Sequence, residues 1–67
     1  MTYDVFQNTV ARLMKKAGIR PENVRFSTDT EKGKHYANCD GVTIIGNSAS
    51  LKMTVKWGSG HMAMARV

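Results

Sequence analysis

The stretch Ala17-Gly18-Ile19-Arg20-Pro21 separates two parts of the chain that differ in hydrophobic period. Before it, apolar residues recur every three or four positions, which is the spacing of one face of a helix. After it, they alternate every second position between turn-forming residues, which is the spacing of half-buried strands. The sequence therefore predicts one amphipathic helix followed by an antiparallel sheet.

The helix is predicted to span residues 2–17. Its apolar face consists of Tyr3, Phe6, Val10, Leu13 and Ala17, with Met14 at the border. Thr2 is suited to the N-cap, and Gly18 to the left-handed conformation that ends a helix. Ile19 then folds back as an apolar contact, and Pro21 prevents the helix from continuing.

Four turn signals divide the remaining residues into the strands of a meander. The clearest is Asp40-Gly41, a preferred pair for a two-residue hairpin loop. The others lie at residues 30–33, 47–50 and 58–60. In chain order, the first three turns each predict a register. The first sets Phe26 opposite Ala37, the second Ala37 opposite Ile44, and the third Ile44 opposite Met53, with the neighbouring pairs following from each.

The last turn permits two registers. One places Trp57 opposite Met62 and sends Met62 and Met64 into the core. The other is a three-residue loop that pairs Trp57 with His61. It turns Met62 and Met64 outward and turns Ala63 and Ala65 inward. The buried face given below uses the first register, with the second as its alternative.

The predicted registers agree on one buried face of the sheet. Its residues are Val24, Phe26, Ala37, Cys39, Val42, Ile44, Leu51, Met53, Val55, Trp57, Met62 and Met64. A one-residue slip would turn any strand's apolar set outward, so this agreement supports the assignment. The fold class is therefore α+β: a single N-terminal helix packed on a four- to five-stranded antiparallel β-meander, in two layers. Residues 1–67 are interpreted as a single domain.

The length limits how this domain is stabilised. A chain of 67 residues buries only about 60% of its unfolded surface. The single cysteine, Cys39, excludes an internal disulfide and is typical of a reducing compartment. A well-packed core or a homodimer must then supply the stability. No apolar run is long enough to cross a bilayer, so we expect a cytoplasmic protein with no membrane contact.

The formal net charge of +5 is distributed unevenly. Residues 41–67 contain no carboxylate, although they include Lys52, Lys56 and Arg66. Such asymmetry favours an acidic partner, of which nucleic acid is the commonest. Solubility alone is the competing explanation.

The predicted outer face of the sheet is polar and basic. It carries Arg25, Ser27, Lys34, Tyr36, Asn38, Thr43, Ile45, Lys52, Thr54 and Lys56. An exposed aromatic ring among cations suits single-stranded nucleic acid, because bases stack on the ring while cations neutralise phosphates. The competing explanation is that threonine, lysine and tyrosine occupy a solvated strand face through strand propensity alone.

The sequence supports three functional hypotheses. The first is a small basic binding module, not an enzyme, that acts on nucleic acid (RNA or single-stranded DNA) or on a nucleic-acid-bound complex. Its site residues are Arg25, Lys34, Lys52 and Lys56 for phosphates, Tyr36 for stacking, and the neighbouring Asn38 and Ile45.

The second hypothesis is a small regulatory or inhibitory protein of the phage or mobile-element type, which occludes a partner protein. Ile45 beside Tyr36 supports it, because an apolar centre with a polar rim is typical of protein interfaces. The third is a small ribonuclease.

Catalytic and metal-binding patterns are weak. His35 and His61 are the only histidines and are expected at the surface or rim. His35 and Cys39 lie about 13 Å apart along a strand, from four steps of about 3.3 Å, so they form no adjacent dyad. The spacing of histidine, cysteine and aspartate matches no zinc motif. We therefore expect no catalytic residues, no metal and no cofactor.

Overall fold

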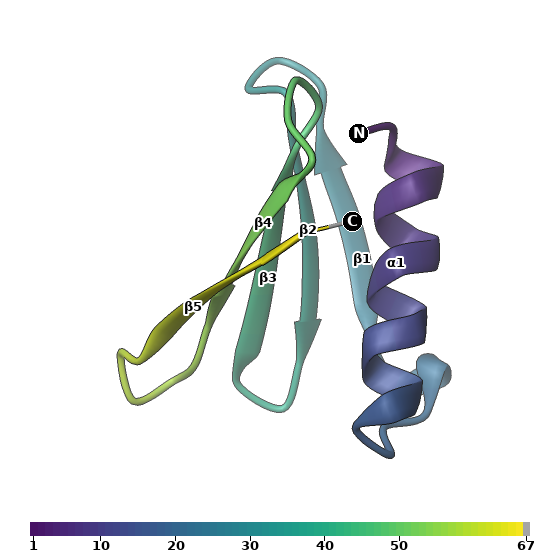
Figure 1. The fold of residues 1–67 in the computed structure, drawn as a ribbon, viewed down its shortest axis with the longest axis vertical. Helices are drawn as coiled ribbons and strands as arrows, with labels where there is room; N and C mark the ends of the chain where they lie inside the picture. The colour runs from purple at the N-terminus through teal and green to yellow at the C-terminus, as the bar shows by residue number, and fades with distance from the viewer. Residues whose placement is uncertain (67) are drawn as a thin grey trace.

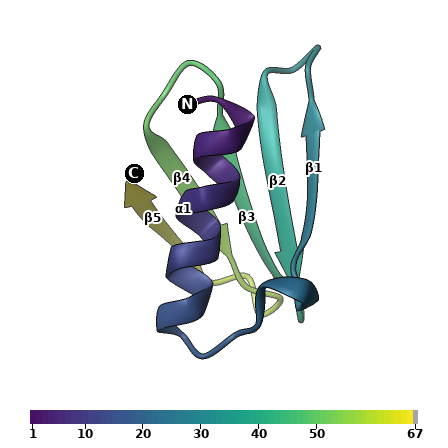
Figure 2. The same ribbon diagram turned by 90° about the vertical axis from the view of Figure 1, so that its right-hand side faces the viewer.

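The structure of the protein, a computed structural model, describes residues 1–66, with the backbone alone for Pro21; Val67, the last residue of the predicted domain, lies outside this range. The elements are α1 (Tyr3–Lys16), a 3-10 turn η1 (Pro21–Asn23), β1 (Arg25–Asp29), β2 (Lys34–Cys39), β3 (Val42–Asn47), β4 (Lys52–Lys56) and β5 (Met62–Arg66). The helix lies on one face of an open five-stranded antiparallel sheet (Figures 1 and 2). The predicted α+β class and two-layer arrangement are confirmed. None of the helices within residues 1–66 is both long and apolar enough to span a membrane.

Both predicted ends of the helix are confirmed. Thr2 is the N-cap, and its Oγ1 accepts a hydrogen bond from the Val5 amide at 3.2 Å. Gly18 follows the last turn with φ +78°, in the left-handed region that glycine tolerates best. The Ile19 amide then donates to the Met14 carbonyl at 2.8 Å, which completes a Schellman motif and folds Ile19 back toward the helix.

The strands follow one another across the sheet in chain order, β1 to β5. The first two predicted registers are confirmed, since Phe26 pairs with Ala37 and Ala37 with Ile44. Asp40 and Gly41 have φ values of 47° and 78°, as a two-residue hairpin loop with positive φ at both positions requires.

The third predicted register is wrong by two residues. Ile44 pairs with Val55 instead of Met53, and Met53 pairs with Gly46. The loop after β3 is longer than the sequence suggested, and it contacts the start of the chain. The ammonium group of Met1 donates to the carbonyl oxygens of Asn47, at the end of β3, and of Ser48 and Ser50 in the loop, at 3.2, 3.0 and 2.7 Å. A shift of two preserves the side-chain parity, so the buried face of β4 is unchanged.

The last hairpin adopts the alternative register. The Trp57 amide donates to the His61 carbonyl at 2.9 Å across a three-residue loop, and Lys56 pairs with Met62. The prediction that Met62 and Met64 are buried is therefore wrong; they are 59% and 67% exposed.

The core lies between α1 and the middle of the sheet. It consists of Phe6, Val10, Met14, Val24, Ala37, Cys39, Ile44 and Met53. Two other residues assigned to the buried face are exposed, Leu51 at 56% and Trp57 at 37%, and Leu13 on the helix is 37% exposed. For Leu13 and Trp57 the reason is visible in Figure 1, where the hairpin between β4 and β5 lies away from the helix and leaves this part of the inner face uncovered. Leu51 lies in the loop before β4.

Candidate nucleic-acid interface on the open sheet face

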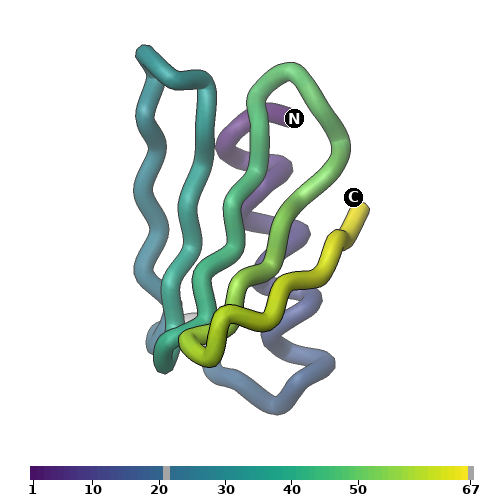
Figure 3. The backbone as a smooth tube through the Cα atoms, turned by 90° about the vertical axis from the view of Figure 1, so that its left-hand side faces the viewer, coloured from purple at the N-terminus to yellow at the C-terminus, as the bar shows by residue number. Residues whose placement is uncertain are grey.

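The face of the sheet opposite α1 carries three rows of side chains, which we call the open face (Figure 3, where the helix lies behind the strands). Residues that pair directly across antiparallel strands lie on the same face, so the registers define each row. The middle row is Ser27, Tyr36, Ile45, Thr54 and Met64. One flanking row is Arg25, Asn38, Thr43, Lys56 and Met62, and the other is Asp29, Lys34, Asn47, Lys52 and Arg66.

All seven residues proposed from the sequence lie on the open face: Arg25, Lys34, Tyr36, Asn38, Ile45, Lys52 and Lys56. Tyr36 and Ile45 are directly opposite each other and half-buried, so they form a flat centre. The four cations are exposed and occupy the rows on either side of that centre. Asn38 Nδ2 donates to Thr43 Oγ1 at 2.9 Å, which fixes the amide and leaves its oxygen available as an acceptor.

Sequence reasoning did not assign five residues of these rows to this face: Asp29, Asn47, Met62, Met64 and Arg66. Arg66 lies opposite Lys52 and adds a fifth cation, while Met62 and Met64 extend the apolar centre toward the edge strand β5. Thr54 Oγ1 donates a long hydrogen bond of 3.7 Å to Met64 Sδ. The three-residue reading of the last turn was the signal that could have found the two methionines.

His35 is buried, which corrects its assignment to the surface or rim. It is 6% exposed and its ring is stacked against Tyr3, with centroids 5.5 Å apart. Nε2 lies 3.1 Å from the Met1 carbonyl, which only accepts, so Nε2 carries the hydrogen. Nδ1 lies 2.8 Å from Thr28 Oγ1. Because both ring nitrogens are engaged, His35 joins the start of the chain to the sheet.

The remaining reactive groups are dispersed. His61 is exposed beside Trp57, with ring centroids 5.1 Å apart. Cys39 is 3% exposed; burial and, to a lesser extent, the charge of Asp40 raise the pKa of its thiol, which keeps it in the poorly nucleophilic protonated form. Within residues 1–66, no group of three or more histidine, cysteine or acidic side chains is placed to hold a metal ion.

Comparison with known proteins gives no match: no family model, curated protein or solved structure is similar to this chain. Its function is therefore inferred from its own geometry and charge.

Proposed function

We propose that the protein is a small basic binding module, without enzymatic activity, that holds single-stranded nucleic acid across the open face. The observation that carries this proposal is the placement of Arg25, Lys34, Lys52 and Lys56 in the two rows that flank Tyr36. Asp29 is the only carboxylate in the three rows, so the face is strongly positive.

A nucleic-acid strand presents flat bases and charged phosphates, and the three rows can contact both. Rows two residues apart along a strand are separated by about 6.6 Å. A nucleic-acid strand lying across the β-strands can therefore stack a base on Tyr36 while its phosphates follow a row of cations. Stacking on an aromatic ring contributes about 1–3 kcal/mol per base, and each phosphate contact releases counterions.

Salt-dependent titration separates these contributions. A mixed-sequence 12-nucleotide single strand, as DNA and as RNA, is titrated by fluorescence anisotropy at several salt concentrations. Replacing Lys52 and Lys56 by glutamine should make the slope of log K against log salt shallower by about 1.4, from two contacts of about 0.7 each. Tyr36→Ala should weaken binding by roughly 5- to 150-fold with little change in slope, because stacking releases no counterions.

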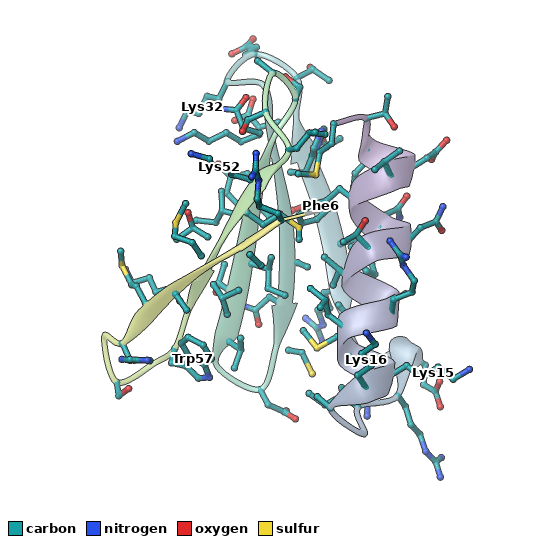
Figure 4. The ribbon with its side chains drawn as sticks, viewed as in Figure 1. Phe6, Lys15, Lys16, Lys32, Lys52 and Trp57 are labelled. Carbon is teal, nitrogen blue, oxygen red and sulfur yellow. The ribbon has the colours of Figure 1, made fainter. Side chains whose placement is uncertain are left out.

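Lys15 and Lys16 provide the matched control. They lie at the C-terminal end of α1, in the other layer of the molecule (Figure 4). Replacing both by glutamine removes the same charge as the Lys52 and Lys56 pair but should leave the slope nearly unchanged. The proposal fails if neither DNA nor RNA binds below about 100 μM at low salt, where ordinary non-specific binding is already stronger.

The second candidate is a regulatory or inhibitory protein that occludes a partner protein. It is favoured by three apolar side chains on the open face, Ile45, Met62 and Met64, because exposed methionines form adaptable contact surfaces. Affinity capture from a host lysate, with and without nuclease, distinguishes the two functions: a partner that survives nuclease treatment favours the second. The third candidate, a ribonuclease, would have to depend on His61, since His35 is buried and engaged at both nitrogens.

A further inference from the structure

A second surface lies on the helix side of the sheet, between α1 and the strands β3, β4 and β5. It is a cleft of about 310 Å³ whose lining is apolar throughout and includes Leu13, Met14, Ile19, Ile44, Val55 and Trp57. Leu13 and Trp57 are each 37% exposed at its opening. A well-packed small domain would ordinarily cover these two side chains, so the cleft has room for anchoring side chains from another molecule.

The opening of this cleft is positively charged. A neighbouring hollow shares Leu13 with the cleft and is otherwise lined by Thr9, Arg12, Lys16 and Arg66. No carboxylate lines either hollow in the part of the chain that the structure describes. In the same residues the recorded ion pair is Arg20 with Glu22 at 3.9 Å, so the three cations beside the cleft are not neutralised by one.

We propose that the cleft is a docking groove for an acidic, apolar segment of a partner protein. Large apolar side chains of the segment enter between Leu13 and Trp57, and its carboxylates pair with Arg12, Lys16 and Arg66. Charge complementarity selects this occupant. A second copy of the chain would bring the same three cations against one another, and a nucleic acid would meet an apolar lining.

This inference does not depend on the proposed function, because the apolar lining of the groove lies on the helix side of the sheet; of the residues named for the two surfaces, only Arg66 belongs to both. A small anionic amphiphile, such as a fatty acid, also combines an apolar part with a negative charge. The cleft is open along one side, however, and therefore suits side chains projecting from a polypeptide better than a fully enclosed alkyl chain.

The test begins with selection of random 12-residue peptides, displayed on phage, against the immobilised protein. Selected peptides should be rich in large apolar residues together with aspartate and glutamate, and poor in lysine and arginine. Synthetic versions are then titrated, with the emission of Trp57 as the reporter, because it is the only tryptophan and lines the cleft. Selection that yields no peptides, or only basic or uncharged ones, contradicts the proposal.

Variants locate the binding site. Leu13→Ser should weaken the selected peptides at least about tenfold, as expected for a central anchor. Val5→Ser is the matched control, since Val5 lies on the same helix with nearly the same exposure, 39%, but away from the cleft. Far-UV circular dichroism verifies that each variant is folded.

Changing the cations beside the cleft tests the proposal without changing the apolar residues that line it. Replacing Arg12 and Lys16, both exposed, by glutamine should weaken the peptides and reduce their salt dependence. The Lys52 and Lys56 double variant should bind them as the unaltered protein does. The assignment is overturned if peptide binding is unchanged both by Leu13→Ser and by the Arg12 and Lys16 replacement. It is also overturned if binding is lost only in the Lys52 and Lys56 variant. Dodecanoate that binds the cleft more tightly than any selected peptide would instead assign it to a small amphiphile.

Discussion

Replacing Gly46 by alanine should destabilise the protein by about 0.5–2 kcal/mol, although the same change in most strands is favourable. An ideal Cβ at Gly46 would lie 2.5 Å from Phe6 Cδ1 and 2.9 Å from Cε1, whereas unbonded carbons keep about 3.5–4.0 Å. The ring would have to retreat by about 1 Å. Phe6 is fully buried, with Phe26 edge-on at 6.3 Å and His35 at 5.6 Å, so it has little space to do so. Overpacking costs about 1–3 kcal/mol and exceeds the roughly 0.5–1 kcal/mol that alanine gains over glycine.

Urea unfolding followed by far-UV circular dichroism measures this change. With a slope near 1 kcal/mol per M, typical of small proteins, the midpoint should fall by about 0.5–2 M. Gly58→Ala is the control, because its Cβ would meet only the Gly41 carbonyl at an ordinary 3.6 Å; it should be neutral or stabilise by up to about 1 kcal/mol. Combining Gly46→Ala with Phe6→Leu should show favourable coupling between the two changes. A Gly46→Ala variant as stable as the original would refute the docking of α1 on β3.

Two further stability predictions use the same measurement. Phe26→Ala should cost about 2–3 kcal/mol because the ring packs on the core, whereas Leu13→Ala should cost only about 1 kcal/mol because its side chain is 37% exposed; equal costs would contradict the uncovered cleft. His35→Ala should cost about 1–3 kcal/mol by leaving Thr28 and the Met1 carbonyl without their partner, while the exposed His61 should be replaceable by alanine at almost no cost. A thousandfold loss of biological activity in a folded variant of either histidine would instead establish catalysis.

The sequence predicted those elements whose geometry is determined locally. Thr2 and Gly18 define the helix ends through their own capping chemistry, and Asp40-Gly41 admits one short hairpin. The loop after β3 was mispredicted from its own residues, and in the structure it hydrogen-bonds to the ammonium group of Met1, more than forty residues away, a contact that no local turn signal indicates. The Gly-Ser-Gly turn after Trp57 accommodates either three or four loop residues, and no side chain there distinguishes them.

The candidate site was better predicted than the core because side-chain parity decides which face a residue occupies. The seven open-face residues needed only the correct parity, which a two-residue error in register preserves. Burial also depends on how much of the sheet the helix covers. The alternation of apolar and polar residues along a strand does not indicate how much is covered. His35 shares a face with Cys39 in the predicted strand, so its inward orientation followed from the sequence, and the expectation of a surface or rim position was wrong.

The presence of two uncovered surfaces follows from the proportions of the fold. Five strands about 4.8 Å apart make a sheet roughly twice as wide as the 10–12 Å diameter of one helix. One helix therefore cannot cover the inner face, and nothing in the described chain covers the outer one. Arg66 belongs to both surfaces, because it lies opposite Lys52 on the open face and also lines the hollow beside the groove. An acidic segment in the groove would consequently reduce the positive potential that attracts nucleic acid to the open face at low salt, and this opposition would vanish as salt screens it.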